Sequence, residues 1–292
     1  MKYATSGAFR NALNAHLRQI INTNGGDLAR LQRRVAYERF LARIFAHHGS
    51  TWVLKGGYSL ELRLGGRARS TKDLDFNAPS SSTEPLIEEV RDAADLDLND
   101  HFHFTVAEPQ RGELQGPPEG GQRFRVTAYL NGAQAFAVFL VDVGQGDKLT
   151  NPPEILSPQV DLTFAGLSQP VLYSYPLPEH FAEKLHAYTR PRPQDSHTRV
   201  KDLLDISLLT RDLGLRPSPA VATVVRDVFI RYHSHDLPPP TELREPPPAW
   251  RTPFQAMATE IGHDVTDSEA AFHDLVRFMT ALLPQGVLGI TT

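Results

Sequence analysis

The stretch LKGGYSLELRLGGRARSTKDLDF, residues 54–76, brings two glycines, a short amphipathic segment, a basic loop and two aspartates together within a few turns of chain. Residues 51–57 have the pattern of a short strand that turns at its glycines into a helix over residues 58–64. Residues 74–78 have the pattern of a second strand. Because glycine and aspartate are both depleted in strand interiors, the stretch predicts a functional site where two strands begin or end.

Gly56 and Gly57 stand at the predicted junction of strand and helix. Glycine allows close approach to the backbone, and the free amides at a helix start favour an anion such as a triphosphate. An ordinary turn explains the two glycines equally well when they are taken alone.

Asp73 and Asp75 lie on one face of the second strand, because side chains alternate with a period of two. Neighbouring carboxylates repel each other unless a cation lies between them, and oxygen ligands suit Mg²⁺ that bridges nucleotide phosphates. A solvated strand end is the simpler explanation of the acids alone. In combination with the glycines they predict a site for Mg²⁺ and an NTP.

Asp142 stands in AFAVFLVDV, residues 135–143, a run that is otherwise apolar and that indicates a buried strand. A buried carboxylate is costly unless it is neutralised or bound. We therefore predict a metal triad of Asp73, Asp75 and Asp142, with Asp142 placed to orient or deprotonate an attacking hydroxyl. The alternative is that Asp142 merely ends the strand before a turn.

Composition restricts the chemistry further. The 292 residues contain no cysteine, which excludes thiolate catalysis and cysteine zinc sites and leaves carboxylate, histidine or water as metal ligands. A net charge of −4 argues against a molecule that binds nucleic acid over its whole surface, although local basic patches remain open. No apolar run is long enough for a membrane span and no signal sequence is evident, so we expect a cytoplasmic protein.

The rest of the chain predicts an α+β protein with a mixed sheet and two lobes. Hydrophobic periodicity indicates helices over residues 6–26, 27–49, 82–96, 179–190, 198–214, 219–233 and 267–283. Strands are expected over 101–108, 123–131 and 133–144, the last two as a hairpin turning at Asn131-Gly132. We expect residues 1–150 to form the helical preface and the sheet-containing core, and residues 151–292 to form a crossover followed by a helical lobe.

Two later helices carry charges on apolar backgrounds. Lys184 lies among Phe181, Leu185 and Tyr188, which would hold its ammonium in place to bind phosphate, although such lysines commonly extend from ordinary amphipathic helices. Asp202 and Asp205 share a helix face, and Lys201 stands four residues before Asp205 as an ion-pair partner. Surface salt bridging explains these acids equally well.

Together these blocks resemble a known family. The two glycines, a helix, DLD on the next strand and a later strand acid look like the DNA polymerase β type of nucleotidyltransferase. More closely, residues 54–76 with EKLHAYT and RVKDLLDISLL resemble the AbiEii/MenT nucleotidyltransferase toxins of bacterial toxin–antitoxin systems. The resemblance covers roughly residues 30–215. The spacer between Gly57 and Asp73 is longer than in most polymerase-like members and fits the toxin branch.

The resemblance implies a polymerase β-like fold and a Mg²⁺-dependent transfer of a nucleoside monophosphate from an NTP. It implies that Lys184 contacts the nucleotide and that Asp202 supports activity. The expected nucleotide-binding residues are Lys55, Gly56, Gly57, Ser59, Lys184, Arg199, Lys201 and Asp205.

The acceptor is expected to be RNA, because basic residues precede the acids and recur over residues 190–201. The expected RNA-binding residues are Arg63, Arg67, Arg69 and Lys72. The resemblance implies the 3′ end of tRNA as acceptor, blocked aminoacylation, growth arrest and a cognate antitoxin as partner; we expect a monomer. Two alternatives remain open: a catalytically idle regulator that binds nucleotide or RNA, and a transferase that modifies a protein or a small molecule.

Ser70 and Thr71 immediately precede the proposed metal acids. A phosphate on either hydroxyl would compete for the metal and repel the incoming triphosphate, so we predict inhibition by phosphorylation here. The alternative is that both residues only shape the turn into the strand.

Overall fold

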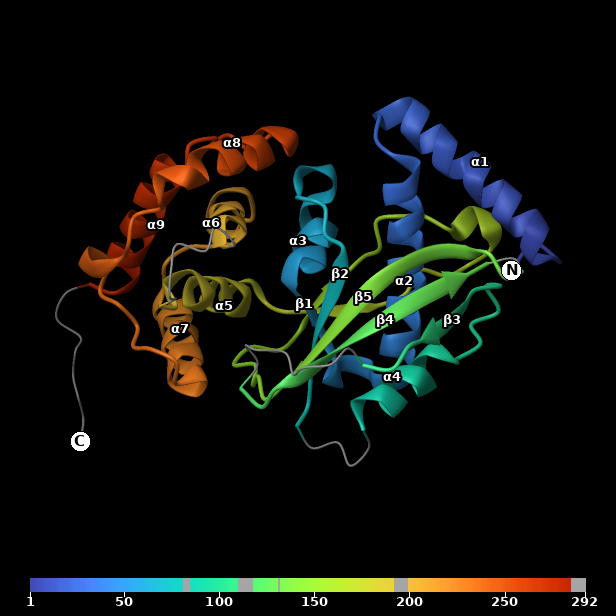
Figure 1. The fold of residues 1–292 in the computed structure, drawn as a ribbon, viewed down its shortest axis with the longest axis horizontal. Helices are drawn as coiled ribbons and strands as arrows, with labels where there is room; N and C mark the ends of the chain where they lie inside the picture. Colours follow the sequence, from blue (N-terminus) through green and yellow to red (C-terminus); the bar gives the residue numbers. More distant parts are fainter. Residues whose placement is uncertain (81–84, 110–117, 131, 192–198, 285–292) are drawn as a thin grey trace. The chain divides into compact units, whose positions relative to one another are not determined.

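The structure, a computed structural model, describes residues 1–80, 85–109, 118–130, 132–191 and 199–284. The chain forms two compact units (Figure 1). Unit 1 comprises Met1–Leu62, Thr71–Asp147 and Pro153–Ser174, and unit 2 comprises Arg63–Ser70, Lys148–Pro152 and Tyr175–Thr292. Residues 153–174, which the sequence places with the helical lobe, therefore belong to the unit that contains the sheet.

A seven-stranded mixed sheet forms the centre of unit 1, in the order β3-β4-β5-β2-β1-β7-β6. β2 runs parallel to β5 and β1 runs parallel to β7, whereas the other neighbours are antiparallel. The predicted mixed α/β class is thus confirmed. The strands are β1 (Val53–Lys55), β2 (Asp73–Ala78), β3 (His103–Val106), β4 (Gly121–Tyr129), β5 (Ala135–Gln145), β6 (Glu154–Leu156) and β7 (Leu172–Ser174).

The first two helices of unit 1 begin at side-chain caps and end at glycines. Thr5 caps α1 (Ser6–Asn24) and Asp27 caps α2 (Leu28–His48), each by accepting a backbone N–H of the first turn. Both helices end at a glycine with positive φ, Gly25 and Gly49. α2 packs on β5, β7, α1 and α4 (Leu86–Ala94). These contacts bury apolar residues of α2 in the core of unit 1.

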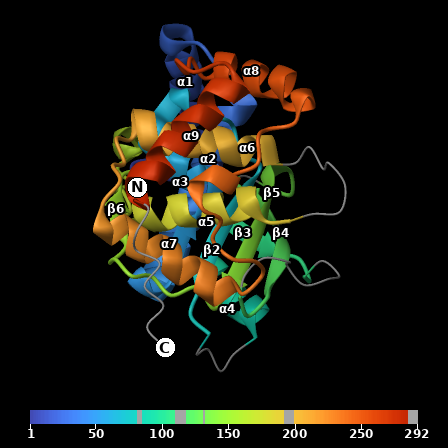
Figure 2. The same cartoon turned by 90° about the vertical axis from the view of Figure 1, so that its left-hand side faces the viewer.

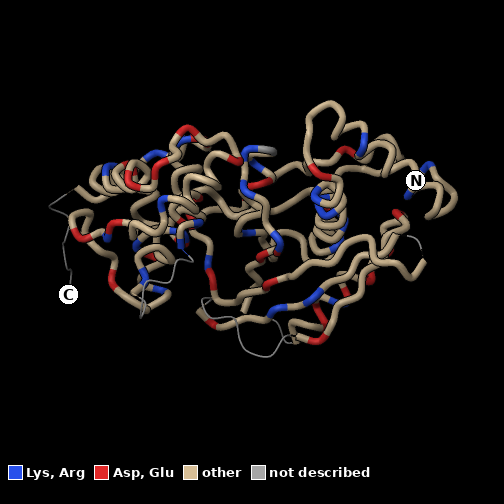
Figure 3. Tube along the Cα trace, turned by 45° about the horizontal axis from the view of Figure 1, so that its top comes forward, with Lys and Arg blue, Asp and Glu red and all other residues tan. Residues whose placement is uncertain are grey.

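Basic residues recur along α2 (Figure 3). Arg39 and Arg43 are buried, and both donate hydrogen bonds to the buried carboxylate of Asp100, at 2.6 Å from Arg39 Nε and 2.8 Å from Arg43 Nη2. Burial raises the pKa of Asp100, but the two arginines outweigh it, and the pKa lies below its ordinary value. These two arginines are therefore part of the internal packing and not a nucleic-acid surface.

Unit 2 is helical. Its helices are α5 (Leu177–Thr189), α6 (Val200–Ser207), α7 (Pro219–Tyr232), α8 (Arg251–Glu260) and α9 (Ser268–Leu282), and Leu208–Asp212 continues α6 as a π-helical turn, η5. α5 packs against α6 and α7, and α6 packs against α8 and α9 (Figure 2). The buried residues Phe181, Leu203 and Met279 lie on three of these helices.

Three elements differ from the sequence prediction. β6 and β7 lie within the segment expected to be a crossover, and α8 was not predicted. β6 and β7 have only three residues each, too few for a strand period to be recognised, and β7 is recruited by pairing with β1. α8 buries only Phe254 and Ala258, so its apolar face is short. Of the predicted hairpin turn, Gly132 has φ +65° and Asn131 lies outside the described residues.

Candidate active site

Gly56 ends β1 and opens α3 (Gly56–Leu64), as the sequence predicts. Its φ is +69°, and a Cβ added there would lie 1.9 Å from Oδ2 of Asp75. The antiparallel register of β1 and β2 places Lys55 opposite Asp75. Gly56, the next residue, therefore lies beside the Asp75 carboxylate. Glycine is therefore required at position 56 both by its backbone conformation and by the carboxylate beside it.

Asp73 and Asp75 are partly exposed on one face of β2, as their spacing predicts. The Thr71 hydroxyl donates a 2.6 Å hydrogen bond to Oδ1 of Asp73, and Thr71 itself is 4% exposed. This hydrogen bond holds the orientation of the Asp73 carboxylate. Thr71 thus positions one of the two acids, whereas Ser70 is exposed.

Tyr37 on α2 is a neighbour of these acids that the sequence did not reveal. Its ring packs edge-on against Tyr58 and Phe139, with centroids 4.9 Å away in each case, and it is 1% exposed. Burial raises the pKa of its hydroxyl, Arg33 lowers it and Asp73 raises it. The charge of Asp73 therefore reaches the hydroxyl of Tyr37, a residue of α2 for which helical periodicity indicated only packing.

Asp142 has a partner other than a metal. The parallel register of β2 and β5 places Asp142 beside Asp75, and the antiparallel register of β4 and β5 places Arg123 on its other side. Arg123 donates from Nε to Oδ1 at 2.6 Å and from Nη2 to Oδ2 at 2.5 Å. Among the residues that the structure describes, no three His, Cys, Asp or Glu are grouped to hold a metal ion. The predicted three-carboxylate group is thus not formed, because a guanidinium already neutralises Asp142.

Two predicted phosphate ligands are occupied within unit 1. Lys55 Nζ lies 2.6 Å from Oδ2 of Asp147, and both side chains are largely buried. Ser59 is fully buried and shares a 2.7 Å hydrogen bond with the hydroxyl of Ser174 on β7. Both side chains thus stabilise the sheet around β1 in this structure. No signal in the local sequence distinguishes this role, because Asp147 and Ser174 are distant in the chain.

A second charged cluster lies within unit 2 and contains Lys184 on α5. Lys184 Nζ lies 2.8 Å from Asp205 Oδ2 and 3.3 Å from Asp202 Oδ1. Asp202 and Asp205 therefore share a face of α6, as predicted. Arg69 makes a bidentate pair with Asp205, at 3.0 and 2.9 Å, and Arg199 Nη1 lies 2.9 Å from Asp202 Oδ2.

Lys184 and Asp205 stay charged although they are buried. Burial lowers the pKa of Lys184, but Asp205 and Asp202 raise it above the ordinary lysine value. Burial raises the pKa of Asp205, but Lys184 and Arg69 bring it below the ordinary value. Lys201, which was predicted to pair with Asp205, is exposed. Packing of α5 on α6 supplies Lys184 as the cation for Asp205 instead.

The predicted RNA-binding residues differ in availability. Arg63 donates to the carbonyl of Tyr175 at 2.6 Å, and Arg69 is held by Asp205. Arg67 is 62% exposed and pairs with Asp212 at 3.0 Å, and Lys72 is exposed. Residues 192–198 of the predicted basic segment lie outside the described residues.

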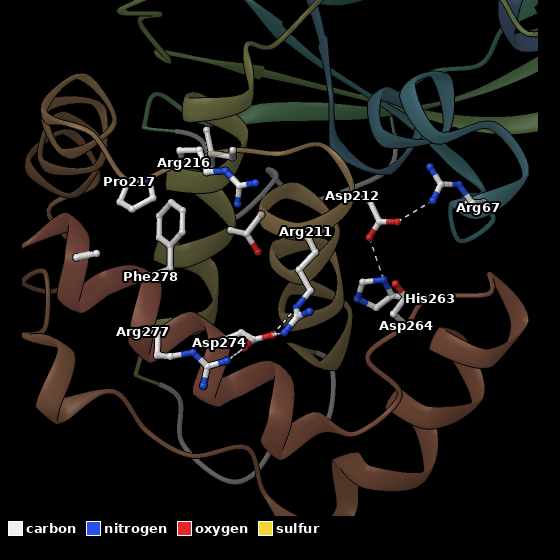
Figure 4. Close-up of a pocket in the computed structure, with 13 residues that line it drawn as sticks. Arg67, Arg211, Asp212, Arg216, Pro217, His263, Asp264, Asp274, Arg277 and Phe278 are labelled. Atoms are coloured by element: carbon white, nitrogen blue, oxygen red, sulfur yellow. Dashed lines mark hydrogen bonds and ion pairs between the residues drawn. The ribbon is translucent and has the colours of Figure 1, made fainter.

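Arg67 also borders a pocket of about 720 Å³ in unit 2 (Figure 4). Arg211, Arg216 and Arg277 line the same pocket, together with three aspartates. Arg211 and Arg277 both pair with Asp274, whereas Arg216 makes no ion pair with the residues drawn there. The sequence did not indicate this pocket, because its arginines come from three segments that are far apart in the chain.

Comparison with solved structures shows what the fold is similar to. MenT4, a nucleotidyltransferase toxin from Mycobacterium tuberculosis, is 20% identical, with a TM-score of 0.59 over 94% of this chain and 90% of that one. JHP933 from Helicobacter pylori is 15% identical, with a TM-score of 0.45 over 86% of this chain and 93% of that one. No curated protein sequence gave a significant match.

Within the described residues, no helix has the length and apolar character needed to cross a membrane.

The profile of one family, described as the nucleotidyl transferase AbiEii toxin of type IV toxin–antitoxin systems, matches residues 39–278. The matched region includes the Gly56 turn, the carboxylate pair on β2 and the Lys184 cluster. The chain therefore belongs to the AbiEii family of nucleotidyltransferase toxins.

Proposed function

We propose that this toxin transfers a nucleoside monophosphate from an NTP to an RNA acceptor, the 3′ end of tRNA, and releases pyrophosphate. The observation that carries the proposal is the pair of partly exposed carboxylates on β2, held beside a glycine turn that tolerates no side chain. A nucleotide added to the 3′ end of tRNA would block aminoacylation and thereby arrest growth. An antitoxin partner follows from the family to which the chain belongs.

The residues present fit a magnesium ion. Mg²⁺ is commonly held by one or two carboxylates together with substrate phosphates, and Asp73 and Asp75 supply two carboxylates on one face. When bound, the ion would neutralise charge on the phosphates and on the reacting oxygens. Thr71 keeps the carboxylate of Asp73 oriented towards that role.

In unit 2, Lys184 and Arg199 are the proposed contacts to the triphosphate. Lys184 keeps its proton at neutral pH, because Asp205 and Asp202 hold its pKa high against the effect of burial. Asp202 is placed to orient both cations, since it pairs with each of them. Lys201 and Asp205 are proposed as further nucleotide-binding residues of unit 2, Asp205 through its hold on Lys184.

The decisive experiment is incubation of the purified toxin with each labelled NTP, Mg²⁺ and total RNA. We expect label on RNA of tRNA size, removable by a nuclease that acts on 3′ ends. Label found only on protein or on small molecules would overturn the RNA acceptor. Binding of NTP without any transfer would instead support the catalytically idle regulator.

Arg216 tests whether the pocket in unit 2 contributes to the acceptor site. If this arginine binds a phosphate of the RNA, reversing its charge should weaken binding to RNA of any sequence. It should also reduce the slope of the logarithm of RNA affinity against the logarithm of salt concentration by about 1. We expect this result for Arg216→Glu and not for Arg244→Glu, a matched change at an exposed position outside the pocket. Equal binding by the two variants would exclude the pocket from the acceptor site.

Phosphorylation of Thr71 or Ser70 is proposed as a means of inhibition. A phosphate on Thr71 would replace the hydrogen bond to Asp73 with a like charge, and Thr71→Glu should slow transfer roughly tenfold or more. Thr71→Ser should retain the hydrogen bond and the activity, and Thr71→Ala should show the smaller loss due to the bond alone. The intact mass of the toxin, measured after co-expression with the antitoxin encoded beside it, shows whether a phosphate has been added. Wild-type rates for Thr71→Glu, with no phosphate found, would leave these residues as a structural turn.

A further inference from the structure

We propose that Arg123 binds the triphosphate of the NTP and that Asp142 positions Arg123 instead of ligating a metal. This assignment rests on the proposed function, because it names a further substrate contact of the same site. Arg123 lies on β4, outside the glycine turn, the carboxylate pair and the helical motifs that the family resemblance singled out.

The first argument is the geometry of the guanidinium. Asp142 accepts from Nε and Nη2 of Arg123 with both of its oxygens, a bidentate arrangement that fixes the plane of the guanidinium. Nη1 has no hydrogen-bond partner among the described residues, and the Arg123 side chain is 36% exposed. One edge of the fork is therefore held by protein and another is available to a ligand.

The second argument is position. Asp142 is the register neighbour of Asp75 in the parallel pair of β2 and β5, so Arg123 belongs to the same row of the sheet. The hydrogen bond from Arg123 to Asp142 raises the pKa of the guanidinium, and the charges of Asp73 and Asp75 raise it further. Arg123 is thus within electrostatic range of the acids that are proposed to hold the metal bound to the triphosphate.

The third argument is charge. Asp73 and Asp75 present two negative charges on one face of β2, and an NTP would bring several more. A guanidinium matches phosphate oxygens in a planar fork and loses little hydration on binding them. A metal ion on the remaining lone pairs of Asp142 would share the carboxylate with the guanidinium and lie close to its positive charge. Retaining the pair and using the remaining N–H groups of Arg123 on the phosphates avoids this repulsion.

The test measures binding to the full-length protein and does not depend on transfer. Calorimetric titration with non-hydrolysable α,β-methylene NTPs, with NMPs and with Mn²⁺ alone separates contacts to phosphate, nucleoside and metal. Arg123→Ala should weaken triphosphate binding about 10- to 100-fold and leave NMP and Mn²⁺ binding unchanged. Arg123→Lys should recover part of the loss. Asp142→Asn should weaken triphosphate binding less than Arg123→Ala, without affecting Mn²⁺, whereas Asp73→Asn should reduce Mn²⁺ binding.

Arg125→Ala is the matched control, because Arg125 is an exposed arginine two residues along the same face of β4 and has Leu140 as its β5 register partner. An equal effect of Arg125→Ala would mean that general charge, and not a positioned fork, attracts the triphosphate. Loss of Mn²⁺ binding in Asp142→Asn, with stronger Mn²⁺ binding in Arg123→Ala, would make Asp142 a metal ligand and overturn the assignment. Unchanged triphosphate binding by Arg123→Ala would reduce the pair to a cross-strand ion pair. A wild-type protein that binds no triphosphate would overturn both this assignment and the proposed function.

Discussion

Asp73→Ala is expected to lower the rate of nucleotidyl transfer by about 10³-fold or more, because the variant loses a ligand of the ion that offsets charge on the reacting oxygens. The measurements are release of pyrophosphate and transfer of label from the NTP under conditions where the wild type is active. Folding should be unaffected, since removal of one of two neighbouring like charges relieves repulsion and the Thr71 hydroxyl keeps the backbone carbonyl of residue 73 as an acceptor, at 3.4 Å.

The matched control is Asp92→Ala, which removes an exposed carboxylate from α4 in the same unit. It should transfer nucleotide at the wild-type rate. Full turnover by Asp73→Ala would remove the carboxylate pair on β2 from the mechanism, and with it the observation on which the proposed function stands.

Asp205→Ala is expected to reduce the free energy of unfolding by about 3–5 kcal/mol, because it leaves two cations in a buried site without their shared counter-charge. Lys184 and Arg69 both pair with Asp205, whose side chain has no exposed surface. Urea unfolding of the variant and the wild type at neutral pH measures the difference. Asp236→Ala, at an exposed position in the same unit, should unfold like the wild type.

The stability that Asp205 contributes is expected to depend on pH. The pKa of Asp205 is lower in the folded protein than its ordinary value near 3.8, because the cations outweigh burial. Its contribution to stability is therefore present above pH 3.8 and is lost as the pH falls towards the folded-state pKa. The gap in unfolding free energy between the wild type and Asp205→Asn should narrow over that acidic range. A gap that does not change with acid would show that Asp205 carries no such charge linkage.

Residues 54–76 illustrate how much of the site was accessible from sequence. Strand alternation placed Asp73 and Asp75 on one face, and the two glycines located the turn from β1 into α3; both features are present in the structure. Helical spacing put Asp202 and Asp205 on one face, and Lys184 bridges them. Each of these inferences depends on a period of two to four residues, which the local backbone imposes regardless of what packs against it.

The same local patterns misassigned partners. Helical spacing offered Lys201 to Asp205, but the nearer cations are Lys184 and Arg69, the second of them 136 residues away in the chain. An apolar run predicted that Asp142 would need a cation, which is correct, but the cation in the structure is Arg123. Ser59 was expected to bind the nucleotide, yet pairing of β7 with β1 places Ser174 against it in the core.

The sequence by itself determined where carboxylates, glycines and a lysine recur with the local periods of strand and helix, and hence the fold class and the chemistry available to the site. Only the tertiary structure decided which charge neutralises which, because strand register and helix packing bring together residues whose separation in the chain carries no period. The role of a buried carboxylate depends on which cation the tertiary structure places beside it. That cation sets whether the carboxylate holds a metal, positions an arginine or stabilises the core. Asp142 beside Arg123 and Asp205 between Lys184 and Arg69 are two carboxylates whose cation was set by strand register and by helix packing.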